Sequence, residues 1–151
     1  MEKENNVYIR QSKTLKSFNY LLNEIQAVYH DMCVKLGLSD SAMIILYTIC
    51  DYGGECMLQE IVRVTGISKQ TINSSIRRLE EEGYIKLNLI GGKNKNVVFT
   101  DKGYEFAKNT VIKIMDIENE VYSSWTKEDI DKYLELTEKY LRQIKEKSET
   151  L

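Results

Sequence analysis

Residues 61–85 read IVRVTGISKQTINSSIRRLEEEGYI, and this stretch decides the fold of the chain. Gly66 separates two helical segments, at about 57–64 and 68–82, and Ser68 is a suitable N-cap for the second one. Two short helices joined by a tight glycine turn are typical of a helix-turn-helix. The sequence therefore predicts this motif in the middle of the chain.

A β-hairpin is predicted directly after the second helix. Apolar and polar residues alternate over 85–89, a polar glycine-containing turn covers 91–96, and 97–100 returns as the second strand. A two-stranded hairpin in this position is the wing of a winged helix-turn-helix. The expected fold class is thus mainly α (α+β), with a two-stranded wing that has a basic tip.

Amphipathic helices are predicted on both sides of the winged region. Apolar residues recur at alternating spacings of three and four up to about Gly37, and a nearly all-apolar helix follows at 39–51. After Thr100 one helix is expected to continue to about Tyr122, and a last amphipathic helix starts at Thr126. The helix at 39–51 should be central and buried.

The apolar faces of the outer helices are larger than a monomer of this size leaves exposed. We expect residues 1–36 to form an N-terminal dimerisation helix, residues 37–103 the winged helix-turn-helix, and residues 104–151 the helices that complete the dimerisation region. A homodimer would bury these faces against a second copy. The residues expected at its interface are Leu15, Phe18, Leu22, Ile130, Leu134, Leu141 and Ile144.

The composition excludes several classes of protein. The chain has 151 residues, a net charge of −2 and 42% hydrophobic residues, as in ordinary globular proteins. Its longest apolar run, 42–50, is about half of the roughly 20 residues that span a bilayer, so a cytoplasmic protein without a membrane segment is expected. Three cysteines without C-x-x-C spacing and one histidine predict neither disulfides nor a metal site. No cofactor and no enzymatic activity are expected.

Basic residues gather around the helix-turn-helix. Residues 63–95 hold seven basic and three acidic side chains. On the helix 68–82, three aliphatic side chains define a buried face, and the opposite flank carries amide, hydroxyl and guanidinium groups that bind base edges and phosphates of double-stranded DNA. The wing adds cations suited to the DNA backbone or minor groove. The candidate DNA-binding residues are Ser68, Lys69, Gln70, Thr71, Asn73, Ser74, Arg77, Arg78, Lys93, Asn94 and Lys95.

Three segments of this region resemble the MarR family of bacterial transcription regulators. They are 61–73 (IVRVTGISKQTIN), 78–85 (RLEEEGYI) and 99–103 (FTDKG), and Gly-Leu-Ser at 37–39 is similar too. The resemblance implies a homodimer built from the first and last helices, with winged domains that bind a palindromic operator. It also implies repression that a small ligand or an oxidant relieves.

The chain departs from the family pattern in two places. The wing carries Gly-Gly-Lys at 91–93 where the family commonly has Asp-x-Arg, so the resemblance identifies neither how the wing is anchored nor which residue enters the groove. Between Leu15 and Tyr29 there is no cysteine of the kind that marks the hydroperoxide-sensing branch. This argues against membership of that branch.

The histidine and the three cysteines suggest an alternative function, that of a thiol-based redox-sensing regulator. His30 and Cys33 stand at i and i+3 on the first helix, close enough for a thiolate–imidazole pair or half of a shared metal site. Packing of Cys33 at the dimer seam is the competing interpretation. Cys50 is expected in the core, and Cys56, which follows two glycines, is the cysteine expected to be exposed.

Tyrosines suggest an effector site. Tyr20, Tyr29, Tyr47 and Tyr52 lie on helices expected to meet between the assembly and winged regions, where they could bind a small aromatic or phenolic effector or replace phenylalanine in packing. A winged-helix module that binds an acidic protein remains the alternative function. Steep salt dependence of binding would distinguish DNA from such a partner.

Overall fold

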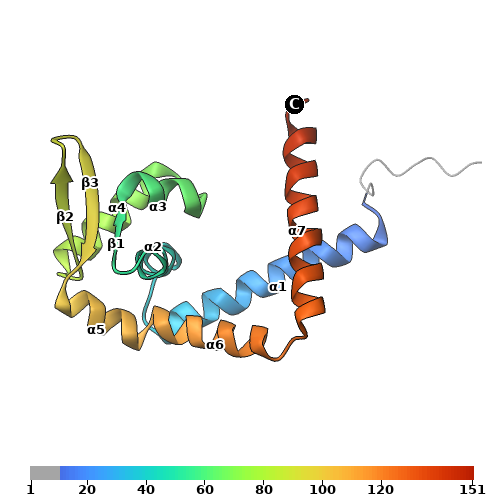
Figure 1. Ribbon diagram of the computed structural model, residues 1–151, viewed down its shortest axis with the longest axis horizontal. Coiled ribbons are helices and arrows are strands. Elements are labelled where there is room, and N and C mark those ends of the chain that lie inside the picture. The colour runs from blue at the N-terminus through green and yellow to red at the C-terminus, as the bar shows by residue number, and fades with distance from the viewer. Residues whose placement is uncertain (1–10) are drawn as a thin grey trace, which may run out of the picture. The chain divides into compact units, whose positions relative to one another are not determined.

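A computed structural model of the chain describes residues 11–151. Over these residues the chain is mainly helical and includes one small antiparallel sheet. Two compact units, Met1–Val111 and Ile112–Leu151, make up the chain. The elements in chain order are α1 (Lys13–Lys35), α2 (Asp40–Asp51), β1 (Glu55–Met57), α3 (Leu58–Thr65), α4 (Lys69–Glu81), β2 (Ile85–Ile90), β3 (Asn94–Phe99), α5 (Asp101–Asn109), α6 (Val111–Ser123) and α7 (Lys127–Ser148) (Figure 1).

Five of the helices begin after a serine or threonine whose hydroxyl group caps the first turn. The side-chain oxygens of Ser12, Ser39, Ser68, Thr100 and Thr126 each accept a hydrogen bond from the backbone N–H three residues later, at 2.9 to 3.2 Å. Each bond satisfies a backbone donor that has no partner within its helix. The predicted starts of α2, α4, α5 and α7 are therefore confirmed.

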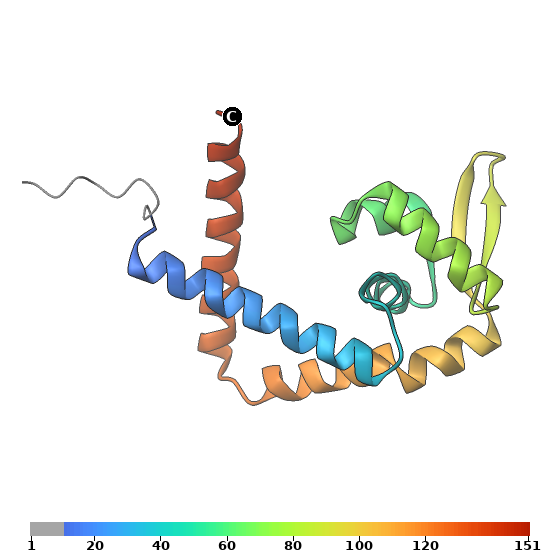
Figure 2. The same cartoon turned by 180° about the vertical axis from the view of Figure 1, so that it is seen from behind.

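Helix α2 forms the centre of the first unit, as its composition predicts. Ile45, Leu46 and Ile49 are fully buried, and α2 contacts α3, α4 and α5. In Figure 2, α2 is seen end-on with α3 and α4 above it. Burial of these aliphatic side chains, at about 1.5 to 3 kcal/mol each, stabilises the platform on which α4 rests.

The predicted two-stranded wing is the hairpin β2–β3, and a third strand, β1, extends the sheet in the order β1-β3-β2. Glu55 pairs with Val98 in the register of β1 on β3, and the Asn96 amide donates to the Glu55 carboxylate at 3.0 Å. A strand of three residues is too short to show alternation, and only its distant partner identifies it. The turn of the hairpin is also shorter than predicted, because 94–96 belong to β3.

The helix predicted from Thr100 to Tyr122 is broken into α5 and α6 at Thr110. This residue leaves the helical region with φ −129° and ψ −93°, and its side chain is buried. Its hydroxyl donates to the Phe106 carbonyl at 2.7 Å, which satisfies a carbonyl near the end of α5. Helical spacing on both sides of the break conceals it in the sequence.

The ends of α4 and β3 meet at the start of α5 in a tight junction. The Thr100 hydroxyl donates to the Gly83 carbonyl at 2.6 Å, and the Thr100 N–H donates to the Tyr84 carbonyl at 3.1 Å. A Cβ atom at Gly103 would lie 1.8 Å from the Tyr84 carbonyl oxygen, so only glycine fits there. The junction holds the C-terminal end of α4 against the base of the hairpin.

In the part of the chain that the structure describes, no single helix has the length and apolar character needed to cross a membrane. Taken together, Lys13–Leu36 and Asp40–Asp51 pass the same test on length and composition, with a 90° bend between them.

Candidate nucleic-acid interface

Helix α4 has the two faces that its sequence predicts. Ile72, Ile76 and Leu79 are 0 to 3% exposed and pin the helix from behind. The side chains that point the other way are exposed, among them Gln70 and Arg77. The exposed flank is therefore free to contact a ligand along the length of the helix.

The first turn of α4 uses some of its polar groups internally. The Ser68 hydroxyl caps the helix and donates to the Thr71 hydroxyl at 2.9 Å. Lys69 is exposed beside them, and Asn73 one turn later is half-buried. Ser68 and Thr71 thus hold the helix start in shape, while Lys69 extends from it.

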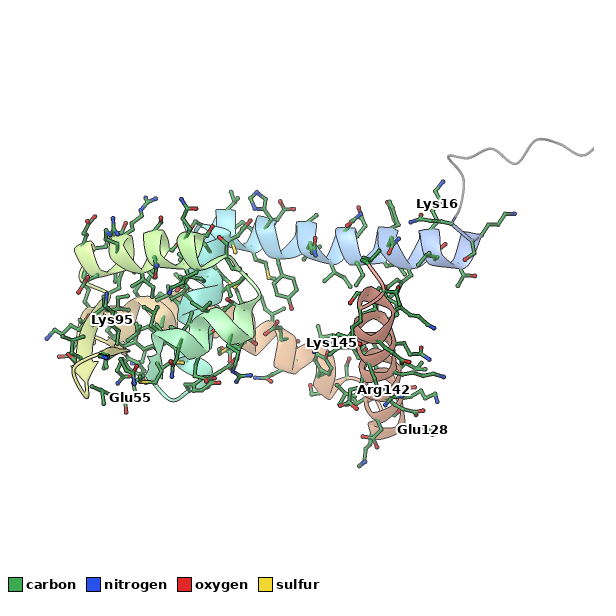
Figure 3. The ribbon with its side chains drawn as sticks, turned by 90° about the horizontal axis from the view of Figure 1, so that it is seen from above. Lys16, Glu55, Lys95, Glu128, Arg142 and Lys145 are labelled. Carbon is green, nitrogen blue, oxygen red and sulfur yellow. The ribbon has the colours of Figure 1, made fainter. Side chains whose placement is uncertain are left out.

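The wing and α4 border one groove of about 490 Å³, which we call the wing groove. It brings Lys69 and Asn73 of α4 together with Lys93, Asn94 and Lys95 of the hairpin. The Lys95 side chain projects from the hairpin in Figure 3, which also labels Glu55 on β1. Gln59 of α3 lines the same groove and was not predicted as a site residue, because no local pattern connects it to the wing.

Two of the basic side chains counted around α4 carry acidic partners. Arg63 binds Glu60 at 2.7 Å, and hydrogen bonding from Arg63 lowers the pKa of the Glu60 carboxyl. Arg78 binds Glu82 at 3.1 Å. The local positive charge that faces a ligand is therefore smaller than the count of basic residues suggests.

The family is decided by the sequence of this same region. Residues 36–89, which contain α2, α3 and α4, match the family model described as MarR family. Residues 36–89 therefore belong to the MarR family. Solved structures similar to this chain are described as MarR family transcriptional regulators.

Three solved structures share the fold over 82 to 97% of this chain. A MarR protein from Peptoclostridium difficile is 20% identical, with 97% of each chain covered and a TM-score of 0.68. The PcaV transcriptional regulator from Streptomyces coelicolor, in complex with its natural ligand, is 12% identical over 82% of this chain and 91% of that chain, with a TM-score of 0.62. A MepR mutant from S. aureus bound to an oligodeoxyribonucleotide is 14% identical over 89% of this chain and 99% of that chain, with a TM-score of 0.52. A search of the curated proteins finds no match.

The thiol predictions are corrected by the structure. His30 faces Asp40, whose two carboxylate oxygens lie 3.0 Å from its Nδ1, and it does not form the suggested pair with Cys33. Cys33 is fully buried, and burial raises its pKa. Cys56, expected to be exposed, is buried because β1 packs its side chain inward, whereas Cys50 is half-buried, with its pKa raised to about 11 chiefly by desolvation.

The tyrosines predicted for an effector site fall into two groups. Tyr29, Tyr47 and Tyr52 line an open pocket of about 490 Å³, together with Met43 and other residues of α2 and the α3 end. Tyr20 is 63% exposed and does not line it. The pocket is thus built from α1, α2 and α3, and the fourth tyrosine lies more than two helical turns away along α1.

The predicted dimerisation residues are exposed to different degrees on α1 and α7. Within α7 no residue is buried, and Figure 3 shows side chains standing out from it, including Glu128, Arg142 and Lys145. Cys33 is the one buried residue of α1. The exposed apolar residues in the predicted set are Leu15, Phe18, Leu22, Leu134, Leu141 and Ile144, and Ile130 is half-buried.

Proposed function

We propose that this regulator represses transcription by binding a palindromic operator as a homodimer, with α4 of each copy in the major groove and the wing on the adjacent backbone or minor groove. The observation that carries the proposal is the polar flank of α4, exposed opposite three buried aliphatic side chains and next to the lysines of the wing groove. The MepR structure bound to an oligodeoxyribonucleotide supports DNA binding by this fold.

The proposed contacts divide into base reading and backbone binding. Gln70 and Asn73 have amides that can bind adenine, and Arg77 can bind the O6 and N7 atoms of guanine. Ser74 lies on the same flank. Contacts to phosphates position the protein without reading sequence. They are assigned to Ser68, Lys69, Thr71, Arg78, Lys93, Asn94 and Lys95.

The apolar faces of α1 and α7 support the homodimer. Leu134 and Leu141 are each about half exposed, with 49% and 50% accessible, as are Ile144 and several neighbours. A 22-residue amphipathic helix without any buried residue is stable in water only when its apolar face packs on something else. A two-fold dimer would place the two α4 helices about 34 to 36 Å apart, one turn of DNA.

The pocket lined by Tyr29, Tyr47 and Tyr52 is the proposed effector site. Its lining combines aromatic and aliphatic side chains with polar groups, which suits a small aromatic or phenolic compound. The Tyr52 hydroxyl donates to Glu60 on α3 at 3.4 Å, so a ligand here would contact the helix that precedes α4. The PcaV regulator in complex with its natural ligand supports a ligand-binding role for this fold.

Selection from a random pool of duplex DNA tests the proposal directly. The expected result is enrichment of an inverted repeat whose half-site centres are about 10 to 10.5 base pairs apart. Binding to the selected site should weaken steeply with added salt, because several phosphates are contacted. Folded protein that enriches no sequence, or whose DNA binding is insensitive to salt, would contradict the proposed function.

A further inference from the structure

A second cleft lies on the side of α4 away from the wing. It has a volume of about 500 Å³, and we call it the serine cleft. Its lining includes Ser39 and Ser41 of the α2 start, and Ser74, Ser75, Arg78 and Glu82 on α4 or just after it. None of these residues lines the wing groove. The exposed flank of α4 is therefore bordered by a cleft on each side.

The order of residues around α4 places its exposed flank, which carries Gln70 and Arg77, between the two clefts. At about 100° per residue, Lys69 and Asn73 lie on one side of Gln70, and Ser74 and Arg78 lie on the other. A helix about 10 to 12 Å wide fills a major groove about 12 Å wide, so a phosphate backbone runs along both of its sides. If the wing groove meets one backbone, the serine cleft faces the other.

The serine hydroxyl groups of the cleft include an unused hydrogen-bond donor that is able to bind a ligand. Ser41 Oγ lies 2.7 Å from Ser75 Oγ and 3.4 Å from Ser39 Oγ, and the Ser39 oxygen accepts from the Ala42 N–H. Each of these two hydroxyl contacts uses one hydrogen, while three hydroxyls supply three. One O–H of Ser39, Ser41 and Ser75 therefore remains to donate to an acceptor such as a phosphate oxygen.

Arg78 is the positively charged side chain that lines the serine cleft, and it forms an ion pair with Glu82. The pair is 3.1 Å apart, and the two side chains are 77% and 43% exposed. Exposed ion pairs of this kind contribute little in water, so a phosphate can replace Glu82 as the partner of Arg78. The Glu82 carboxylate then lies beside the phosphate and repels it.

We propose that the serine cleft binds a phosphate of the operator backbone through Arg78 and the serine hydroxyls, and that Glu82 limits the affinity for DNA by competing for Arg78. This rests on the proposed placement of α4 in the major groove. The cleft thereby becomes a second backbone contact beside the wing groove. Glu82 acts as a built-in restraint on binding to any duplex.

A double-mutant cycle tests this proposal. The affinities of the wild type, Glu82→Gln, Arg78→Ala and the double variant are measured by fluorescence anisotropy on the selected operator and on a random duplex, over a range of salt. Glu82→Gln should strengthen binding to both duplexes by roughly 3- to 10-fold. Arg78→Ala should weaken binding to both alike and reduce the salt slope by about 1, and Glu82→Gln should bring no gain in that background.

Glu81→Gln is the matched control, because it removes the same charge from the neighbouring residue, the last of α4, which does not line the cleft. Two results would overturn the proposal that Glu82 competes for Arg78. One is an equal gain in DNA affinity from Glu81→Gln, and the other is a gain from Glu82→Gln that persists in the Arg78→Ala background. A loss confined to the operator in Arg78→Ala would make Arg78 a base reader and overturn the phosphate site. Failure of the wild type to select any operator would instead refute the proposed function.

Discussion

At the scale of single residues, Arg77 is the side chain proposed to read guanine. It is exposed on the flank of α4, and no ion pair within the described residues occupies it. Arg77→Ala should therefore cost about 1 to 3 kcal/mol of binding to the selected operator and relax preference at one base position. Anisotropy titrations on the operator and on single-base variants measure this. Equal loss on operator and random DNA would refute the reading role.

Gly103 is the residue with the least tolerance for change in the folded chain. Because an added Cβ would meet the Tyr84 carbonyl oxygen at 1.8 Å, the junction of α5 with the end of α4 would have to shift. Gly103→Ala should lower the free energy of unfolding by about 1 to 3 kcal/mol or more. Chemical denaturation monitored by circular dichroism checks this, with Lys113→Ala, at an exposed site on α6, as a control expected near wild type.

The raised pKa values of the three cysteine thiols lead us to expect that the stability of the fold and the reactivity of the thiols depend on pH. Burial raises the pKa of Cys50 to about 11 from 9.0, and that of Cys33 and Cys56 in the same direction. The folded state therefore favours the protonated Cys50 thiol, and the stability it contributes is full below about pH 9 and is lost as the pH rises through 11. Alkylation of the native protein should be slow at pH 7 for all three thiols. Rapid modification of any of them would restore the redox alternative.

At the scale of elements, the hairpin contributes positive charge at its tip. Lys93 lies in the turn after Gly91 and Gly92, both with positive φ, and is exposed. Lys93→Ala should weaken binding to operator and random DNA by the same factor and reduce the salt slope by about 1. A salt series on both duplexes measures the two slopes. A loss seen on the operator alone would show that the wing reads sequence.

At the scale of the whole molecule, the proposed binding of a palindrome would depend on assembly of two copies. A glutamate at Leu134 or Leu141 would place a charge in an apolar interface, so Leu134→Glu and Leu141→Glu should shift the protein towards monomer and weaken operator binding by 10-fold or more. Light scattering and anisotropy report the two effects. Lys139→Glu, on the polar side of α7, is the control and should remain dimeric. Monomeric wild-type protein that still binds the full operator tightly would contradict the assembly.

Part of this molecule follows from the sequence alone. The helix-turn-helix, the buried face of α4 and the helix starts at Ser39, Ser68, Thr100 and Thr126 were all predictable, because capping and periodicity are properties of neighbouring residues. The family follows from the same stretch. For the candidate site, this was enough to name the exposed flank of α4 and the basic wing.

The rest depends on contacts between residues far apart in the chain. The pairing of β1 with β3 placed Cys56 inside and gave the wing a third strand, and the α1–α2 contact turned His30 towards Asp40 instead of Cys33. The wing groove and the serine cleft exist only because α4 packs between the hairpin and the start of α2. Periodicity identifies which face of an element is buried, but the partner that covers it is selected by packing of the whole chain.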